Sequence, residues 1–179
     1  MIEIERKFRI SPEQKAAIEK YFKNNGSDLV PVHQIDQVFL QGINSFKDFK
    51  SGKPVARLRT VDNKTQLTYK RAINDAGDTL EHELGVESAD TMQKILEEMG
   101  YQQVTLVDKT RIEMKQGRLT LVLDEVARLG SFLEIELLAE QADTGGAEEQ
   151  ILQSAAQFGL TAANIEPKKY DQLLGSLPA

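Results

Sequence analysis

The feature that most limits the fold of this chain is a repeated alternation of charged and apolar residues. In the opening segment, MIEIERKFRI, the charged Glu3, Glu5 and Lys7 alternate with isoleucine and phenylalanine. Successive side chains of a strand point to opposite faces, so this strand has one charged face and one apolar face. Taken alone, the segment fits an ordinary surface strand whose charged face meets water. Its meaning depends on whether other strands repeat the pattern.

The rest of the chain reads as further strands interrupted by helices. Strands are predicted over 1–10, 33–40, 54–61, 65–72, 79–86, 104–114, 118–126 and 131–139, from alternation between turn signals. Helices are predicted over 11–25, 87–101, 145–159 and 166–177, from capping residues and apolar residues at helical spacing. The DNK sequence at 62–64 predicts a hairpin turn. No repeat or flexible linker divides the chain, so we expect one α+β domain over residues 1–179.

Most of the predicted strands carry their charges on a single face. The cations are Lys7, Arg57, Arg59, Lys70, Lys109 and Arg111, and the acids are Glu3, Glu5, Glu81, Glu83, Asp124, Glu134 and Glu136. An open sheet with these faces in water is one arrangement. The other is a closed eight-stranded antiparallel β-barrel, a tunnel with a charged interior and helices packed on the outside. Burying like charges is costly, so such a tunnel needs mixed signs and a polyanion or metal ions to complete the pairing.

The composition limits which kinds of metal site and covalent cross-link the chain can form. The chain has no cysteine and two histidines, which excludes disulfides, thiolate metal sites and a histidine-rich zinc site. A metal would be held by carboxylates, which favour magnesium, manganese or calcium.

The net charge of -6 argues against general nucleic-acid binding, and the absence of a long apolar window or signal peptide predicts a soluble, cytoplasmic protein that does not bind membranes. Arginine and lysine suit phosphate oxygens, and no GxxxxGK[ST] loop occurs, so the pattern indicates a metal-triphosphate site of another kind.

These motifs resemble the CYTH superfamily, the triphosphate tunnel metalloenzymes. EIERK resembles the family's ExExK signature, and the later motifs follow in the family's order: RLR at 57–59, TYK ending at Lys70, LEHE, DKTR, LVLDEV around Asp124, LGSFLEIE at 129–136 and KKY at 168–170. FKDF at 46–49 and LGSFLEIE are most similar to class IV adenylate cyclases. The chain departs from the family in QIDQVFL, where relatives often have QxDxYFD, and at Thr79, where an arginine often begins an RxExE motif.

The resemblance implies a role for each charged residue. It implies that Glu3, Glu5, Asp124, Glu134 and Glu136 bind Mg2+ or Mn2+, that Arg57, Arg59, Lys70, Lys168 and Lys169 bind the triphosphate, and that Lys7, Lys109 and Arg111 are catalytic. Glu81 and Glu83 either bind metal or orient arginines. Each acid could instead be a surface residue and each cation an ion-pair partner. Lys168 and Lys169 either reach over one tunnel mouth from the last helix, or are lysines at a helix C-terminus, or are solvated lysines.

The implied reaction is the metal-dependent conversion of ATP to cyclic AMP and pyrophosphate. Hydrolysis of inorganic, nucleoside or thiamine triphosphate by the same tunnel is the alternative, because both reactions use the same cations and metal ions. A non-catalytic module that binds polyphosphate or nucleotides is the third hypothesis. The expected partner is ATP or another triphosphate, and a homodimer is left open.

Overall fold

The computed structural model describes residues 2–26, 29–43, 53–72, 79–139 and 144–177, so the FKDF segment at 46–49 lies outside the described residues. The strands are β1 (Ile2–Arg9), β2 (Val32–Gln41), β3 (Val55–Val61), β4 (Lys64–Ala72), β5 (Thr79–Val86), β6 (Tyr101–Gln116), β7 (Leu119–Val126) and β8 (Gly130–Ala139). The helices are α1 (Pro12–Asn25), α2 (Ala89–Glu98), α3 (Thr144–Ala156) and α4 (Tyr170–Gly175), with a 3-10 helix η3 (Ala162–Asn164). The predicted α+β class is confirmed.

The strands form one antiparallel sheet in the order β1-β8-β7-β6-β2-β3-β4-β5. Its ladders include the neighbours β1–β8, β7–β8, β2–β3, β3–β4 and β4–β5. Strands β1 and β5 are the two ends of this order, and no ladder between described residues joins them. The eight-stranded antiparallel sheet is therefore confirmed, whereas its closure into a barrel is not.

The chain divides into two compact units. Unit 1 contains residues Met1–Val32 and Thr110–Lys168, and unit 2 contains His33–Lys109 and Lys169–Ala179. Strand β6 therefore gives its N-terminal part to unit 2 and its C-terminal part to unit 1. The single domain over 1–179 stays a prediction. In the part of the chain that the structure describes, no helix is long and apolar enough to cross a membrane.

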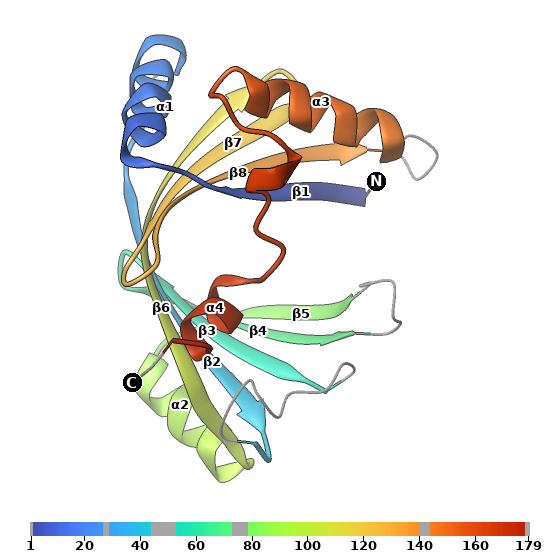
Figure 1. The fold of residues 1–179 in the computed structure, drawn as a ribbon. Coiled ribbons are helices and arrows are strands. Elements are labelled where there is room, and N and C mark those ends of the chain that lie inside the picture. Colours follow the sequence, from blue (N-terminus) through green and yellow to red (C-terminus); the bar gives the residue numbers. More distant parts are fainter. Residues whose placement is uncertain (1, 27–28, 44–52, 73–78, 140–143, 178–179) are drawn as a thin grey trace. The chain divides into compact units, whose positions relative to one another are not determined.

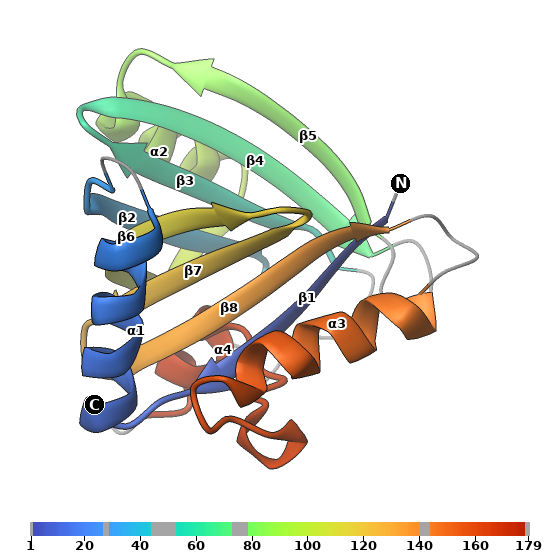
Figure 2. The same ribbon diagram turned by 90° about the horizontal axis from the view of Figure 1, so that it is seen from above.

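In unit 1, helices α1 and α3 pack on the apolar face of strands β1, β7 and β8 (Figures 1 and 2). Helix α1 begins after Ser11 because Ser11 and Gln14 form a capping box, each side chain bonding the other residue's backbone N–H. Its residues Ile18 and Phe22, four positions apart, both face the core. The buried strand residues of this core are Ile4, Phe8, Met114, Leu121, Leu123, Leu133, Ile135 and Leu137.

In unit 2, helix α2 packs Leu96 on an apolar cluster that contains Phe39 of β2 and Leu58 of β3 (Figure 1). Strands β3 and β4 are joined at Asp62 and Asn63, whose φ angles are 47° and 63°. Two consecutive positive φ angles are those of a type I′ turn, which asparagine and aspartate tolerate. The hairpin turn predicted at 62–64 is thus confirmed.

The last predicted helix, over 166–177, is wrong in its start. Ile165 makes an isolated antiparallel bridge with Phe8, and the Glu166 backbone N–H donates a 2.7 Å hydrogen bond to the Lys7 carbonyl. The segment is extended here because Pro167 disfavours helical backbone at the residue before it. Helix α4 therefore begins only at Tyr170, after a segment whose residues 165 and 166 bond to β1.

Candidate triphosphate site

The ladder between β1 and β8 brings the charged residues of unit 1 together. Lys7 lies opposite Glu134, and Glu5 lies opposite Glu136. Paired residues of a ladder share a face of the sheet. The alternation predicted for these strands is confirmed, because their apolar residues are buried on the opposite face. Glu3 also lies in β1, but its side chain is outside the described part of the chain.

Arg111 of β6 joins two carboxylates from neighbouring strands. Its Nε and Nη2 donate to the two oxygens of Asp124 at 2.7 and 2.6 Å, and Nη2 also donates to Glu134 at 2.5 Å. The Asp124 side chain is fully buried, and that of Glu134 is 6% exposed. A bidentate guanidinium–carboxylate pair is among the stronger charge-assisted hydrogen bonds. Arg111 therefore offsets the desolvation cost of these acids.

Two predicted catalytic lysines are buried, which is rare for lysine. Lys7 is 8% exposed on the charged face of β1, beside Glu134 in the ladder. Lys109 belongs to unit 2 and is 4% exposed, with its Nζ atom 5.2 Å from the centre of the Tyr170 ring. The negative face of the ring attracts the ammonium group. Both lysines are thus held in defined places within their own units.

In unit 2, an acid that sequence reasoning left out of the site holds one of the predicted arginines. The Nε and Nη2 atoms of Arg59 donate to the two oxygens of Asp36, both at 2.7 Å. Asp36 lies opposite Arg59 in the β2–β3 ladder and is 6% exposed. The sequence offered one signal, the aspartate that QIDQVFL shares with the family's QxDxYFD motif, and recognising its partner required the register of the two strands.

Arg57, two residues before Arg59, is held differently. Its Nη2 donates to the hydroxyl of Thr68 at 3.2 Å, and that hydroxyl donates to Glu83 at 2.9 Å. Arg57 and Glu83 are 3.7 Å apart, and Thr68 is fully buried. Burial, and after it the nearby charge of Arg59, lowers the pKa of Arg57 from its ordinary value. Thr68 is a second residue that sequence reasoning left out of the site.

Glu81, the remaining predicted acid of unit 2, also pairs with a cation. Lys70 donates to Glu81 at 2.9 Å across the β4–β5 ladder. Glu83 contacts Arg57, as the arginine-orienting role would require, whereas Glu81 contacts a lysine; both predicted roles of these acids stay predictions.

The acids predicted to bind a metal fit it in chemistry but are not gathered around one point. Carboxylate oxygens are the ligands that Mg2+ and Mn2+ prefer. However, no three acids or histidines among the described residues are placed to hold a metal ion. Both oxygens of Asp124 bond Arg111, which also bonds Glu134, and Glu5 is exposed. The set of Glu3, Glu5, Asp124, Glu134 and Glu136 as metal ligands therefore stays a prediction.

Lys168 and Lys169 do not lie inside or at the C-terminus of the last helix. Both are exposed and precede α4, and Lys169 is its N-cap residue. The prediction that they extend from a helix was wrong because that helix starts after Pro167. Their contact with a triphosphate stays a prediction.

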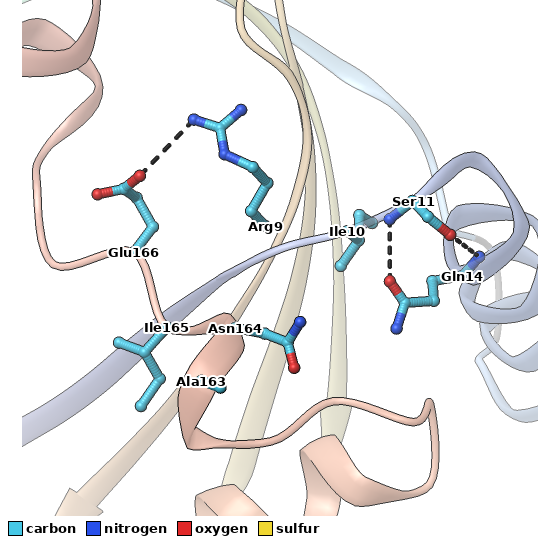
Figure 3. A pocket seen from close by; sticks show the side chains of 8 residues that line it. All are labelled: Arg9, Ile10, Ser11, Gln14, Ala163, Asn164, Ile165 and Glu166. Carbon is cyan, nitrogen blue, oxygen red and sulfur yellow. Dashed lines mark hydrogen bonds and ion pairs between the residues drawn. The ribbon is translucent and has the colours of Figure 1, made fainter.

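A pocket of about 500 Å3 lies in unit 1 beside the C-terminal end of β1, the start of α1 and residues 163–166 (Figure 3). Arg9 lines it, forms a 3.6 Å ion pair with Glu166, and donates to the Leu129 carbonyl at 2.9 Å. None of the predicted site residues lines this pocket. The pocket is therefore not part of the candidate site.

Known proteins resemble the chain over nearly its whole length. A protein of Methanocaldococcus jannaschii named "Putative adenylate cyclase" is 26% identical over 178 residues, which cover 98% of this chain and 99% of that protein. A solved structure from Pyrococcus horikoshii is 25% identical with a TM-score of 0.75, over 97% of this chain and 99% of that one. A Hippeastrum protein described as a "Putative adenylyl cyclase" with a dominant triphosphatase activity shares the fold, at 17% identity and a TM-score of 0.56, over 85% and 86% of the two chains.

A match to the CYTH domain over most of the chain identifies the family. The CYTH domain matches residues 1–170, a range that includes β1 to β8 and all but the C-terminal helix of the fold. The charged faces of both units lie within this range. This chain therefore belongs to the CYTH domain family.

Proposed function

We propose that this protein converts ATP to cyclic AMP and pyrophosphate in a metal-dependent reaction, as the resemblance to class IV adenylate cyclases implies. The observation that carries the proposal is the burial of charged side chains on the strand faces of a CYTH domain. Lys7, Asp36, Lys109, Asp124 and Glu134 are all less than 9% exposed. Buried charges are costly to maintain for stability alone, so they indicate a functional site. The name of the archaeal relative favours the cyclase reaction.

In the proposed reaction, the ribose 3′-oxygen attacks the α-phosphorus of ATP, and the bond from this phosphorus to the bridging oxygen of pyrophosphate breaks. The hydroxyl proton leaves to solvent or to a basic group. Arg57, Arg59 and Lys70 hold phosphate oxygens, while Lys7, Lys109 and Arg111 stabilise the charge that grows on the leaving group. We also propose that the strands close into the tunnel that the sequence predicts.

Magnesium or manganese, when bound, would neutralise phosphate charge. The residues proposed to hold it are Glu3, Glu5, Asp124, Glu134 and Glu136. Asp124 and Glu134 already accept hydrogen bonds from Arg111, and the further lone pairs of their carboxylate oxygens would hold the metal ion.

Triphosphate hydrolysis is the second candidate. The observation that favours it is the dominant triphosphatase activity in the description of the Hippeastrum protein, whose fold this chain shares. The same cations would bind the substrate, with water attacking the terminal phosphorus instead of the 3′-oxygen attacking the first.

The experiment is product analysis. The purified chain is incubated with ATP and, separately, with inorganic triphosphate, with Mg2+ or Mn2+ at neutral and alkaline pH. We expect cyclic AMP and an equal amount of pyrophosphate from ATP. ADP or orthophosphate without cyclic AMP would replace the cyclase proposal with the hydrolase, and binding without any product would indicate the non-catalytic module. Glu134→Gln should abolish turnover, whereas Lys20→Gln, at an exposed position of α1, should not.

A further inference from the structure

The two arginines of β3 differ in how many of their N–H groups are already bonded. Asp36 takes both Nε and Nη2 of Arg59 in a bidentate pair with two 2.7 Å bonds. Arg57 gives only Nη2 to Thr68, and its Nε is buried with no hydrogen-bond partner among the described residues. A buried N–H group without a partner is costly, so Arg57 gains a hydrogen bond if its side chain turns to bring this N–H to a phosphate oxygen. Arg57 thus has fewer of its N–H groups bonded than Arg59 does.

The charges of the two arginines also differ in their effect on an approaching anion. Asp36 is nearly buried and in direct contact with Arg59, so it offsets much of the positive charge of that guanidinium. Glu83 lies 3.7 Å from Arg57 and is 44% exposed, so its charge is better screened by water. The charge of Asp36 also acts on Arg57 through space, but only Arg59 is in direct contact with it, so an anion meets less competition for the N–H groups of Arg57.

The rigidity of Arg59 has a separate consequence. A bidentate carboxylate fixes the plane of a guanidinium, and the remaining N–H groups of Arg59 then point in a fixed direction without further loss of entropy. Fixed donors stabilise charge that develops in a transition state more effectively than donors that must first reorganise. The pair with Asp36 thus reduces ground-state attraction for a polyanion and preserves transition-state stabilisation.

We propose that Asp36 is a positioning residue of the triphosphate site, which holds Arg59 for the transition state and leaves Arg57 as the main ground-state contact of unit 2 with phosphate. This inference rests on the proposed function, because it assumes a triphosphate on this face of β3. It assigns different roles to two arginines that the RLR motif presents as equivalent.

The test combines binding and turnover in the full chain. Binding of inorganic triphosphate is measured by calorimetry in excess EDTA, and turnover is measured with the metal that supports it. For Asp36→Asn we expect unchanged or tighter binding, because a negative charge is lost, and a kcat at least about tenfold lower, because Arg59 is no longer fixed. Asp36→Glu should recover part of the kcat. Asp62→Asn, which removes the same charge at the exposed turn of this hairpin, should leave both quantities near their wild-type values.

The arginines are then compared directly by lysine substitution. Arg57→Lys should weaken triphosphate binding by at least about tenfold, because lysine cannot reproduce the several N–H donors of a guanidinium. Arg59→Lys should lower kcat more than it weakens binding. Equal losses of binding in the two variants, or parallel losses of binding and kcat in Asp36→Asn, would overturn the proposal and indicate a merely structural pair. A wild-type chain that neither binds nor converts triphosphates would overturn the proposed function and this inference together.

Discussion

Replacing Arg111 by methionine tests whether the buried charge cluster of unit 1 depends on one guanidinium. In the wild-type chain, Arg111 makes three hydrogen bonds to Asp124 and Glu134. Their side chains are 0% and 6% exposed, so neither carboxylate gains much from water when the guanidinium is removed. Methionine keeps much of the apolar volume of arginine and removes the charge.

The expected loss follows from the burial of the pair. Removing one partner of a buried ion pair typically costs about 3–5 kcal/mol, because the other charge stays buried without compensation. For a chain of this size, each kcal/mol lowers the melting temperature by about 2–4 °C, so we expect a decrease of roughly 6–20 °C. Lys7 lies opposite Glu134 and can offset part of the remaining charge, which favours the lower half of this range.

The assay is urea unfolding at neutral pH followed by circular dichroism, with thermal unfolding in parallel. The triple variant Arg111→Met, Asp124→Asn, Glu134→Gln should recover part of the lost stability, since it leaves no uncompensated carboxylate at these positions. Arg71→Met, at an exposed position of β4, is the matched control and should change the free energy of unfolding by less than about 0.5 kcal/mol. If Arg111→Met were as stable as this control, the cluster would not be the buried, mutually dependent unit that its geometry indicates.

Two further predictions concern the attachment of α1 in unit 1. Ser11→Ala removes the acceptor for the Gln14 backbone N–H and should lower the free energy of unfolding by about 1 kcal/mol, while Ser11→Asp should keep the cap; equal urea midpoints for the two variants would contradict this. Lys15 donates to Glu125 at 2.6 Å, and this hydrogen bond raises the pKa of Lys15. A raised pKa means that the stabilisation is complete below the unfolded pKa of about 10.4 and is lost as pH rises through the folded value. Because Glu125 is 62% exposed, Lys15→Gln should cost less than about 1 kcal/mol at pH 7, and the difference should shrink in thermal melts at higher pH; a constant difference up to about pH 11 would contradict it.

Local features of the fold could be predicted from the sequence because they depend on neighbouring residues. The charged and apolar faces of the strands follow from the two-residue period of the backbone, which does not depend on the strand's neighbours. The start of α1 follows from Ser11 and Gln14, and the β3–β4 turn follows from Asp62 and Asn63, which adopt positive φ at low cost. The α+β class and the set of buried strand residues in unit 1 are consequences of these local rules.

The partner of each charge was decided only by the tertiary structure. Arg59 bonds Asp36 rather than a glutamate of β5 because β2 lies beside β3 with these two residues in register. The side chain of Arg111 in β6 reaches Asp124 of the next strand, β7, and also Glu134 of β8, which lies one strand further along the sheet. Strand order and register depend on the burial of the whole apolar face, a property of many distant residues together, so a single segment of sequence does not contain them. The alternation along each strand thus determined which residues lie on the charged face. The order and register of the strands determined which of these residues form ion pairs with one another.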